Sequence, residues 1–70
     1  MSYLVIVEKG DGSFGAYVPD LPGCAAVGET EEEALGLIRQ AITLHLEGLK
    51  ERGVPIPEPR SHAQLVAAGR

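Results

Sequence analysis

Three acidic side chains, Glu8, Asp11 and Asp20, are the candidates for a metal-dependent nuclease site. Such a site needs several carboxylates that converge on metal ions about 4 Å apart. Only Glu8 falls in an expected strand, whereas Asp11 occupies a turn and Asp20 lies in a loop between prolines, where Asp is favoured for local hydrogen bonding. We therefore expect no metal site, and a residual metal-dependent nuclease ranks behind the binding functions considered below.

The single cysteine, Cys24, is the candidate nucleophile, with His45 or His62 as its activating base. A catalytic thiol needs an electropositive and partly exposed setting, and the neighbouring Ala25 and Ala26 offer none. Cysteine is among the residue types most often buried, so we expect Cys24 to pack in the core. The sequence thus predicts no catalytic residue and requires no cofactor.

Length and composition indicate one small domain with a thin core. The chain has 70 residues, with one Phe, two Tyr and no Trp, and so short a chain buries little of its surface. A single cysteine fits a reducing compartment, and the apolar run Leu4–Val7 is too short to span a bilayer, so we expect a cytoplasmic protein. The net charge of −4 argues against direct nucleic-acid binding and suits a basic protein partner.

Two strands and a turn are expected at the start of the chain. Tyr3–Glu8 is rich in β-branched residues, Gly10–Ser13 supplies a hairpin turn, and Phe14–Val18 completes the hairpin. Prolines then interrupt the pairing at Pro19–Gly23, because proline cannot donate a ladder hydrogen bond. A short third strand is expected at Cys24–Val27.

A long helix follows, with clear signals at both ends. Thr30 and Glu33 have the spacing of a capping box. Gly53 can adopt the left-handed conformation that ends a helix, and Pro55 prevents continuation. The helix is therefore predicted to run from Thr30 to about Arg52.

The predicted helix has more apolar surface than one sheet covers. At about 100° per residue its apolar side chains span an arc of about 200°, roughly twice the stripe that a sheet needs. Leu37, Leu44 and His45 lie in this arc, and we expect them at an oligomer interface, the alternative for His45 being a core position bonded to a backbone carbonyl. The first strand is also apolar on both faces, which favours self-association or a partner unless the C-terminal tail covers it.

After the helix, the sequence predicts an extension and a tail. Prolines alternate from Pro55 to Pro59 and favour an extended, polyproline-like tether. The segment Ser61–Ala68 fits two structures, a short helix capped by Ser61 or a fourth strand through Gln64–Val66.

Three motifs, in this order along the chain, closely resemble the N-terminal domain of HicB-like antitoxins: Tyr17–Cys24 (YVPDLPGC), Gly28–Ala34 (GETEEEA) and Gly53–Pro57 (GVPIP). The resemblance covers Tyr3 to about Pro59. It implies an α+β fold of β-β-β-α order, in which a three-stranded antiparallel sheet packs on one long helix. This is a reduced RNase H-like fold, in which oligomers are usual.

The resemblance also implies a function in binding rather than catalysis. In operon-encoded members this domain binds and masks a HicA-like toxin, a small mRNA-cleaving protein of a type II toxin–antitoxin system, while a separate C-terminal domain binds operator DNA. We expect one HicB-like domain over residues 1–70, with its core in 1–53 and the extension and tail in 54–70, and no C-terminal DNA-binding domain. The expected partner is a small basic toxin; the alternative is an orphan oligomeric scaffold or ligand-binding module without a toxin.

The loop after the second strand is the candidate partner-binding site. Its residues are Tyr17, Pro19, Asp20, Leu21 and Pro22, and its two prolines leave little conformational entropy to lose on docking. Apolar anchors such as Tyr17 and Leu21 would supply affinity, while acidic charge sets the association rate. The structural alternative is a turn that only redirects the chain between strands.

Overall fold

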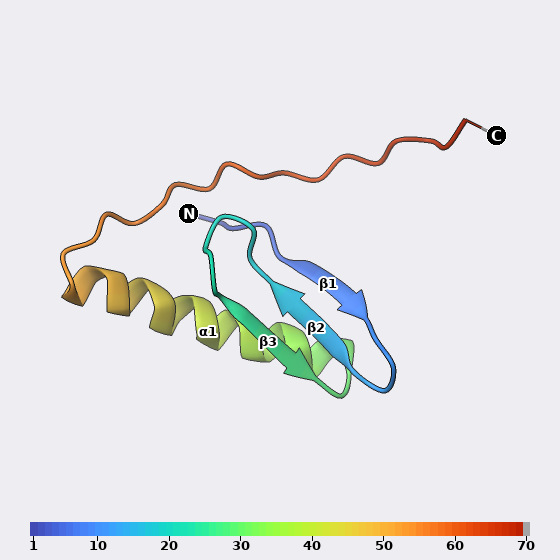
Figure 1. Cartoon of the computed structure of the whole chain (residues 1–70), viewed down its shortest axis with the longest axis horizontal. Coiled ribbons are helices and arrows are strands. Elements are labelled where there is room, and N and C mark those ends of the chain that lie inside the picture. The colour runs from blue at the N-terminus through green and yellow to red at the C-terminus, as the bar shows by residue number, and fades with distance from the viewer. Residues whose placement is uncertain (70) are drawn as a thin grey trace.

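The structure, a computed structural model, describes residues 1–69. The chain forms three strands, β1 (Ile6–Lys9), β2 (Phe14–Tyr17) and β3 (Ala25–Gly28), followed by one helix, α1 (Glu31–Glu51). The helix packs against one face of the sheet, mainly on β3 and β2 (Figure 1). The predicted α+β fold and its element order are confirmed. In the part of the chain that is described, no helix is long and apolar enough to cross a membrane.

The sheet is antiparallel in the order β1-β2-β3. The turn between β1 and β2 uses Gly12 at a φ of 76°, a conformation that only glycine adopts without strain. Strand β1 begins at Ile6 rather than at the predicted Tyr3. The register that pairs Ile6 with Tyr17 would bring Leu4 opposite Pro19, which has no N–H to donate, so the ladder ends there.

The two faces of the sheet differ in what covers them. On the helix side, Val7, Ala16 and Ala26 lie opposite one another across the three strands and belong to the core or pack against it. The other face carries side chains that alternate with these. Exposed residues on this open face include Tyr17 and Val27. The sequence predicts apolar side chains on both faces, and the helix covers only one of them.

Both ends of α1 have the predicted caps. The Thr30 hydroxyl accepts a hydrogen bond from the Glu33 backbone N–H at 3.0 Å, and the Glu33 carboxylate accepts one from the Glu29 N–H at 2.9 Å. At the C-terminal end, Gly53 has a φ of 69°, and the N–H of Val54 donates to the carbonyl of Leu49 at 2.9 Å. This is the Schellman arrangement, which satisfies carbonyls that the last turn leaves free.

One cluster of buried side chains joins the sheet, the loop and the helix: Ala16, Val18, Leu21, Cys24, Ala34 and Ile38. The expectation that Cys24 packs in the core is confirmed, and burial raises the pKa of its thiol. An uncharged thiol in such a setting is a packing group rather than a nucleophile.

Residues 54–69 form neither a helix nor a strand, so neither of the two structures predicted for Ser61–Ala68 forms in the single chain. The segment runs in extended form from the end of α1 past the N-terminus (Figure 1). Residues 62–69 are all exposed, and they therefore do not cover the open face of the sheet.

The approach of α1 to β3 is set by Gly28. A Cβ atom at this position would lie 2.6 Å from the backbone nitrogen of Ala34, closer than non-bonded atoms pack. The atoms that this Cβ would meet are backbone atoms of Glu33 and Ala34, which cannot rotate away. A side chain at position 28 would therefore force the helix away from the sheet.

We therefore predict that Gly28→Ala lowers the free energy of unfolding by about 1–3 kcal/mol, as expected for an overpacked core. The matched control is Gly36→Ala within α1, where nothing lies within 4 Å of the added methyl; it should raise stability by about 0.5–1 kcal/mol because alanine favours the helix. Urea unfolding followed by circular dichroism measures both. Equal effects of the two substitutions would contradict the assigned contact.

Candidate functional site

The loop between β2 and β3 is closed by its own backbone. The Val18 N–H donates to the Cys24 carbonyl at 3.1 Å, the Leu21 N–H to the Val18 carbonyl at 3.1 Å, and the Cys24 N–H to the Leu21 carbonyl at 3.0 Å. Gly23, with a φ of 84°, provides the reversal that these bonds require. The loop is thus a defined turn, as its structural interpretation predicted.

Leu21 does not face a partner. Its side chain is 0% exposed and belongs to the core cluster, so the expectation that it anchors a bound protein is corrected. A leucine flanked by Asp20 and Pro22 looks like an exposed loop residue in the sequence. Its burial depends on the way the turn folds back toward α1, which no local pattern reveals.

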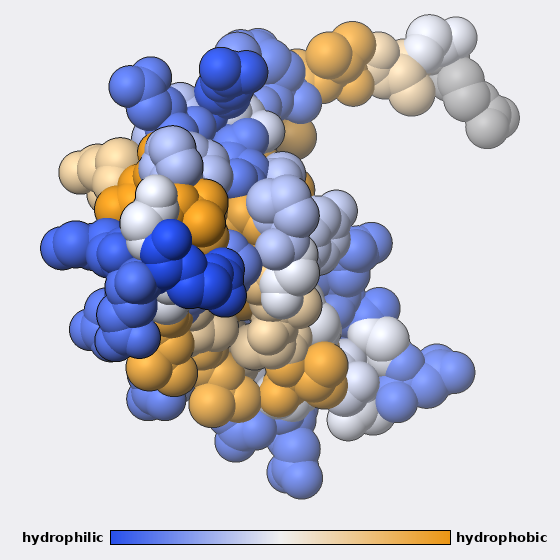
Figure 2. Space-filling model, turned by 60° about the vertical axis from the view of Figure 1, so that its left-hand side comes forward, coloured by the Kyte–Doolittle hydropathy of each residue, from blue (hydrophilic) through white to orange (hydrophobic). Residues whose placement is uncertain are grey.

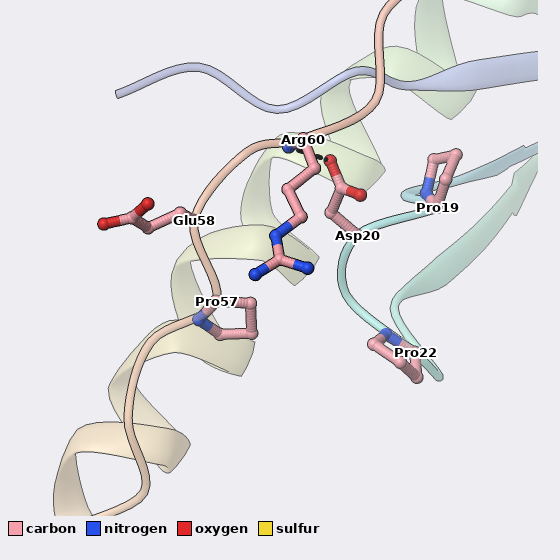
Figure 3. A pocket seen from close by; sticks show the side chains of 6 residues that line it. All are labelled: Pro19, Asp20, Pro22, Pro57, Glu58 and Arg60. Atoms are coloured by element: carbon pink, nitrogen blue, oxygen red, sulfur yellow. Dashed lines mark hydrogen bonds between the residues drawn. The ribbon is translucent and has the colours of Figure 1, made fainter.

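Asp20 binds the tail of its own chain. Its Oδ2 atom accepts hydrogen bonds from the backbone N–H groups of Arg60 (Figure 3) and Ser61, both at 2.8 Å. Its Oδ1 atom accepts one from the Ser61 hydroxyl, also at 2.8 Å. We call these three bonds the Asp20 latch. The carboxylate predicted for a partner site therefore joins two segments separated by about forty residues. The role of Ser61 in this contact was not predicted.

The latch stabilises the charged form of Asp20. The backbone N–H of Ser61, then that of Arg60, then the Ser61 hydroxyl hold the pKa of this carboxyl below its ordinary value of 3.8. Three donors directed at one carboxylate are charge-assisted hydrogen bonds, which are stronger than neutral ones.

A second contact attaches the same segment to the start of the chain. The hydroxyl of Tyr3 donates to the carbonyl oxygen of Pro57. With the latch, this bond attaches the extension on both sides of Pro59. The extension is therefore held against the folded body up to Ser61.

The loop and the extension enclose a shallow hollow of about 320 Å³. Figure 3 shows the guanidinium of Arg60 between the rings of Pro57 and Pro22, with the side chain of Glu58 directed away from them. The full lining is Pro19, Asp20, Pro22, Pro57, Glu58 and Arg60. Three rigid proline rings next to one cation form a surface of fixed shape.

The other candidate residues of the loop are accessible. Tyr17 is 42% exposed, on the open face of the sheet, and Pro19 and Pro22 are exposed on the loop itself. The structure therefore brings Tyr17, Pro19 and Pro22 to the surface around one turn, with Asp20 between them engaged by the tail.

The candidate oligomer residues form a separate surface on α1. Leu44 is 68% exposed and Leu37 is 38% exposed, whereas His45 is half-buried. None of the three lines the hollow beside the loop. The structure leaves two leucines of the wide apolar arc uncovered.

The three acidic candidates for a nuclease do not come together. Within residues 1–69, no three His, Cys, Asp or Glu side chains are grouped so that they could hold a metal ion. Asp20 is used by the latch instead.

Comparisons with known proteins agree on one family. Residues 3–69 match the profile of a family described as HicB_like antitoxin of bacterial toxin–antitoxin system. The crystal structure of the N-terminal domain of the Burkholderia pseudomallei antitoxin HicB is similar, with a TM-score of 0.74 and 39% identity over 83% of this chain and 69% of that chain.

Two curated relatives show how the length of this chain compares with the lengths of similar proteins. A UPF0150 protein of Thermoplasma acidophilum is 41% identical over 69 residues, which are 97% of this chain and 100% of the relative. A 14.9 kDa protein of Haemophilus phage HP1 is 33% identical over 66 residues, 94% of this chain but 50% of that protein. The chain thus spans one relative completely and half of another.

The Asp20 latch makes the position of the extension depend on pH. The pKa of the latched carboxyl lies below 3.8, so the latch contributes its full stability above that value and loses it as the pH falls through the lower pKa of the latched state. In an NMR titration, the amide signal of Ser61 should move toward its unbonded position with a midpoint below 3.8.

The matched control is Asp20→Asn, which keeps an acceptor oxygen but cannot titrate. In this variant the Ser61 amide should show no such transition, and its hydrogen exchange at neutral pH should be faster than in the parent chain. A midpoint at or above 3.8 in the parent would be evidence against the latch.

Proposed function

The chain belongs to the HicB-like antitoxin family, and from this premise we propose that it binds and masks a HicA-like toxin that cleaves mRNA. The family has an antitoxin role in toxin–antitoxin systems, and this implies a toxin as the kind of partner. Masking requires only that one protein cover the active surface of another. It needs no catalytic group on the antitoxin.

The observation that carries this proposal is the exposed and rigid rim around Tyr17. An aromatic residue that is 42% exposed is an effective anchor, because it buries a large area with few rotatable bonds. Pro19 and Pro22 restrict the backbone beside it, and three backbone hydrogen bonds close the turn. Little conformational entropy is therefore lost when a partner docks there.

Charge supports a basic partner. The chain has a net charge of −4, and the first turn of α1 carries Glu31, Glu32 and Glu33, all exposed. Attraction between opposite charges accelerates the encounter of two proteins, and this attraction weakens as the salt concentration rises. A small basic toxin fits this distribution better than a nucleic acid, whose phosphates would be repelled.

We also propose that the chain forms homo-oligomers through the helix face that contains Leu37, Leu44 and His45. The support is the exposure of Leu44 at 68% and Leu37 at 38% on one helix. Residues seven positions apart lie on the same side of a helix, so the two leucines form one apolar stripe.

The masking proposal is tested by co-expression with the small basic protein encoded beside the gene for this chain. Growth should recover when both proteins are present, and the two should co-purify. Tyr17→Ala is expected to weaken the complex by about 2 kcal/mol, roughly 30-fold in Kd, as for an interface hot spot. Calorimetry of the purified proteins measures this change.

Gln40→Ala, at an exposed position on α1, is the matched control and should leave Kd unchanged. Raising the salt concentration should slow association of the parent chain more than dissociation. If no toxic neighbour exists, the orphan scaffold gains support. If the Tyr17 and Gln40 variants bind a toxin equally, the masking surface is not the one proposed.

The oligomer is tested by Leu44→Glu, which places a charge in the apolar stripe. The average mass in sedimentation velocity should decrease while the unfolding midpoint stays close to that of the parent, because Leu44 is not part of the buried core. Gln40→Glu adds the same charge elsewhere on α1. An unchanged mass in the Leu44 variant would argue that another surface holds the oligomer.

A further inference from the structure

Residues 62–69 extend from the body as an arm. The Asp20 latch holds the chain at Arg60 and Ser61, and every residue after Ser61 up to residue 69 is exposed. Figure 2 shows the arm as a projection with hydrophobic side chains near its end. Leu65 and Val66 are 102% and 87% exposed, so they have no packing partner within their own chain.

The arm differs in composition from the extension that precedes it. Residues 61–69 contain no charged residue and no proline, whereas residues 54–60 contain three prolines, a glutamate and an arginine. Exposed strand-like segments normally carry charges or prolines that prevent pairing with another chain. Residues 61–69 carry neither, so nothing in their composition opposes pairing with another chain.

The edge of the sheet at β1 offers a matching site. Strand β1 (Ile6–Lys9) is an edge strand, and within residues 1–69 no backbone hydrogen bond is made on its outer side. Such an edge is a template onto which an extended segment adds as a further strand. Within residues 1–69 the outer edge of β3 also makes no backbone hydrogen bond; the β1 edge fits an apolar arm better because the half-buried Leu4 and Ile6 lie along it.

We propose that residues 62–69 of one copy of this chain add as a fourth strand to the outer edge of β1 in a second copy. Neighbouring residues of a strand point to opposite faces, so Leu65 and Val66 would cover one face each. On the acceptor, Leu4 and Ile6 are only half-buried and lie where added side chains would cover them. The fourth strand that the sequence allows at Gln64–Val66 thus forms only between copies.

The latch makes this exchange favourable. Because Asp20 fixes Ser61, and Tyr3 binds Pro57, the arm starts from a defined point and is already extended. An arm whose attachment point is fixed loses less entropy on pairing than one that follows a free extension. Two copies related by a two-fold axis can exchange arms reciprocally, which closes the assembly as a dimer.

Disulfide mapping tests the pairing directly. One chain carries Glu8→Cys, at the exposed end of the β1 edge, and the other carries a cysteine at each position from 63 to 68 in turn. Residues opposite each other on paired strands have Cα atoms about 4.5–5.5 Å apart, within the range of a disulfide. After mild oxidation, we expect linked pairs at alternate arm positions only, because every second residue shares a face.

Two controls separate pairing from collision. Gln40→Cys on α1 in place of Glu8→Cys should give no linked pairs with the arm, and chains with only the buried Cys24 give the background. Leu65→Lys in the arm should abolish the links, whereas His62→Lys should keep them. Either variant leaves the core cluster intact, so loss of links does not reflect unfolding.

Three outcomes overturn the proposal: no links to β1, equal links at all six arm positions, or links that form within one chain carrying both cysteines at high dilution. The first means that the arm does not reach the edge of a second copy. The second means that a mobile arm collides at random, and the third means that the arm pairs with its own sheet. Each result is independent of whether a toxin binds at Tyr17.

Discussion

The burial of Leu21 is the constraint on which the rest of this small structure depends. A loop between two short strands would ordinarily lie free on the surface, but here its central side chain is 0% exposed and packs in the core with Ile38 of α1. Because the buried Leu21 side chain anchors the loop to the core, the side chains of the neighbouring residues point in fixed directions. Tyr17 is turned to the open face of the sheet, and Asp20 is turned toward the extension that follows the helix.

The elements with local signals could be predicted from the sequence, and their ends follow from single residues. The Thr30 hydroxyl caps the N–H of Glu33 at the start of α1, the Glu33 carboxylate binds the N–H of Glu29, and Gly53 defines the end of the helix by a positive φ. The strands were predicted in number, order and approximate place. The predicted start of β1 was wrong, because the strand can begin only where the opposite residue of β2 can form a hydrogen bond. The register places Pro19 opposite Leu4, and proline has no N–H to donate.

The candidate site depends on contacts that are distant in sequence, and these were only partly predictable. The sequence marks the loop by its two prolines and its tyrosine, but the direction in which each side chain points is set by packing. Nothing near Ser61 signals that its hydroxyl and N–H bind a carboxylate about forty residues earlier. The excess of apolar surface was predicted, since helix periodicity can be counted. Which part of it stays uncovered could be known only once the sheet was in place.

The Asp20 latch also divides the chain by its susceptibility to proteolysis. Proteases cut most readily in exposed chain ends and loop tips, and residues 62–69 have no internal hydrogen bond or packing contact that must first be broken. The segment before Ser61 is protected by the Tyr3 and Asp20 contacts. A cut beyond the latch would leave the sheet, the helix and the Tyr17 rim unchanged, so the same folded body can exist in a long and a short form that differ only in the arm.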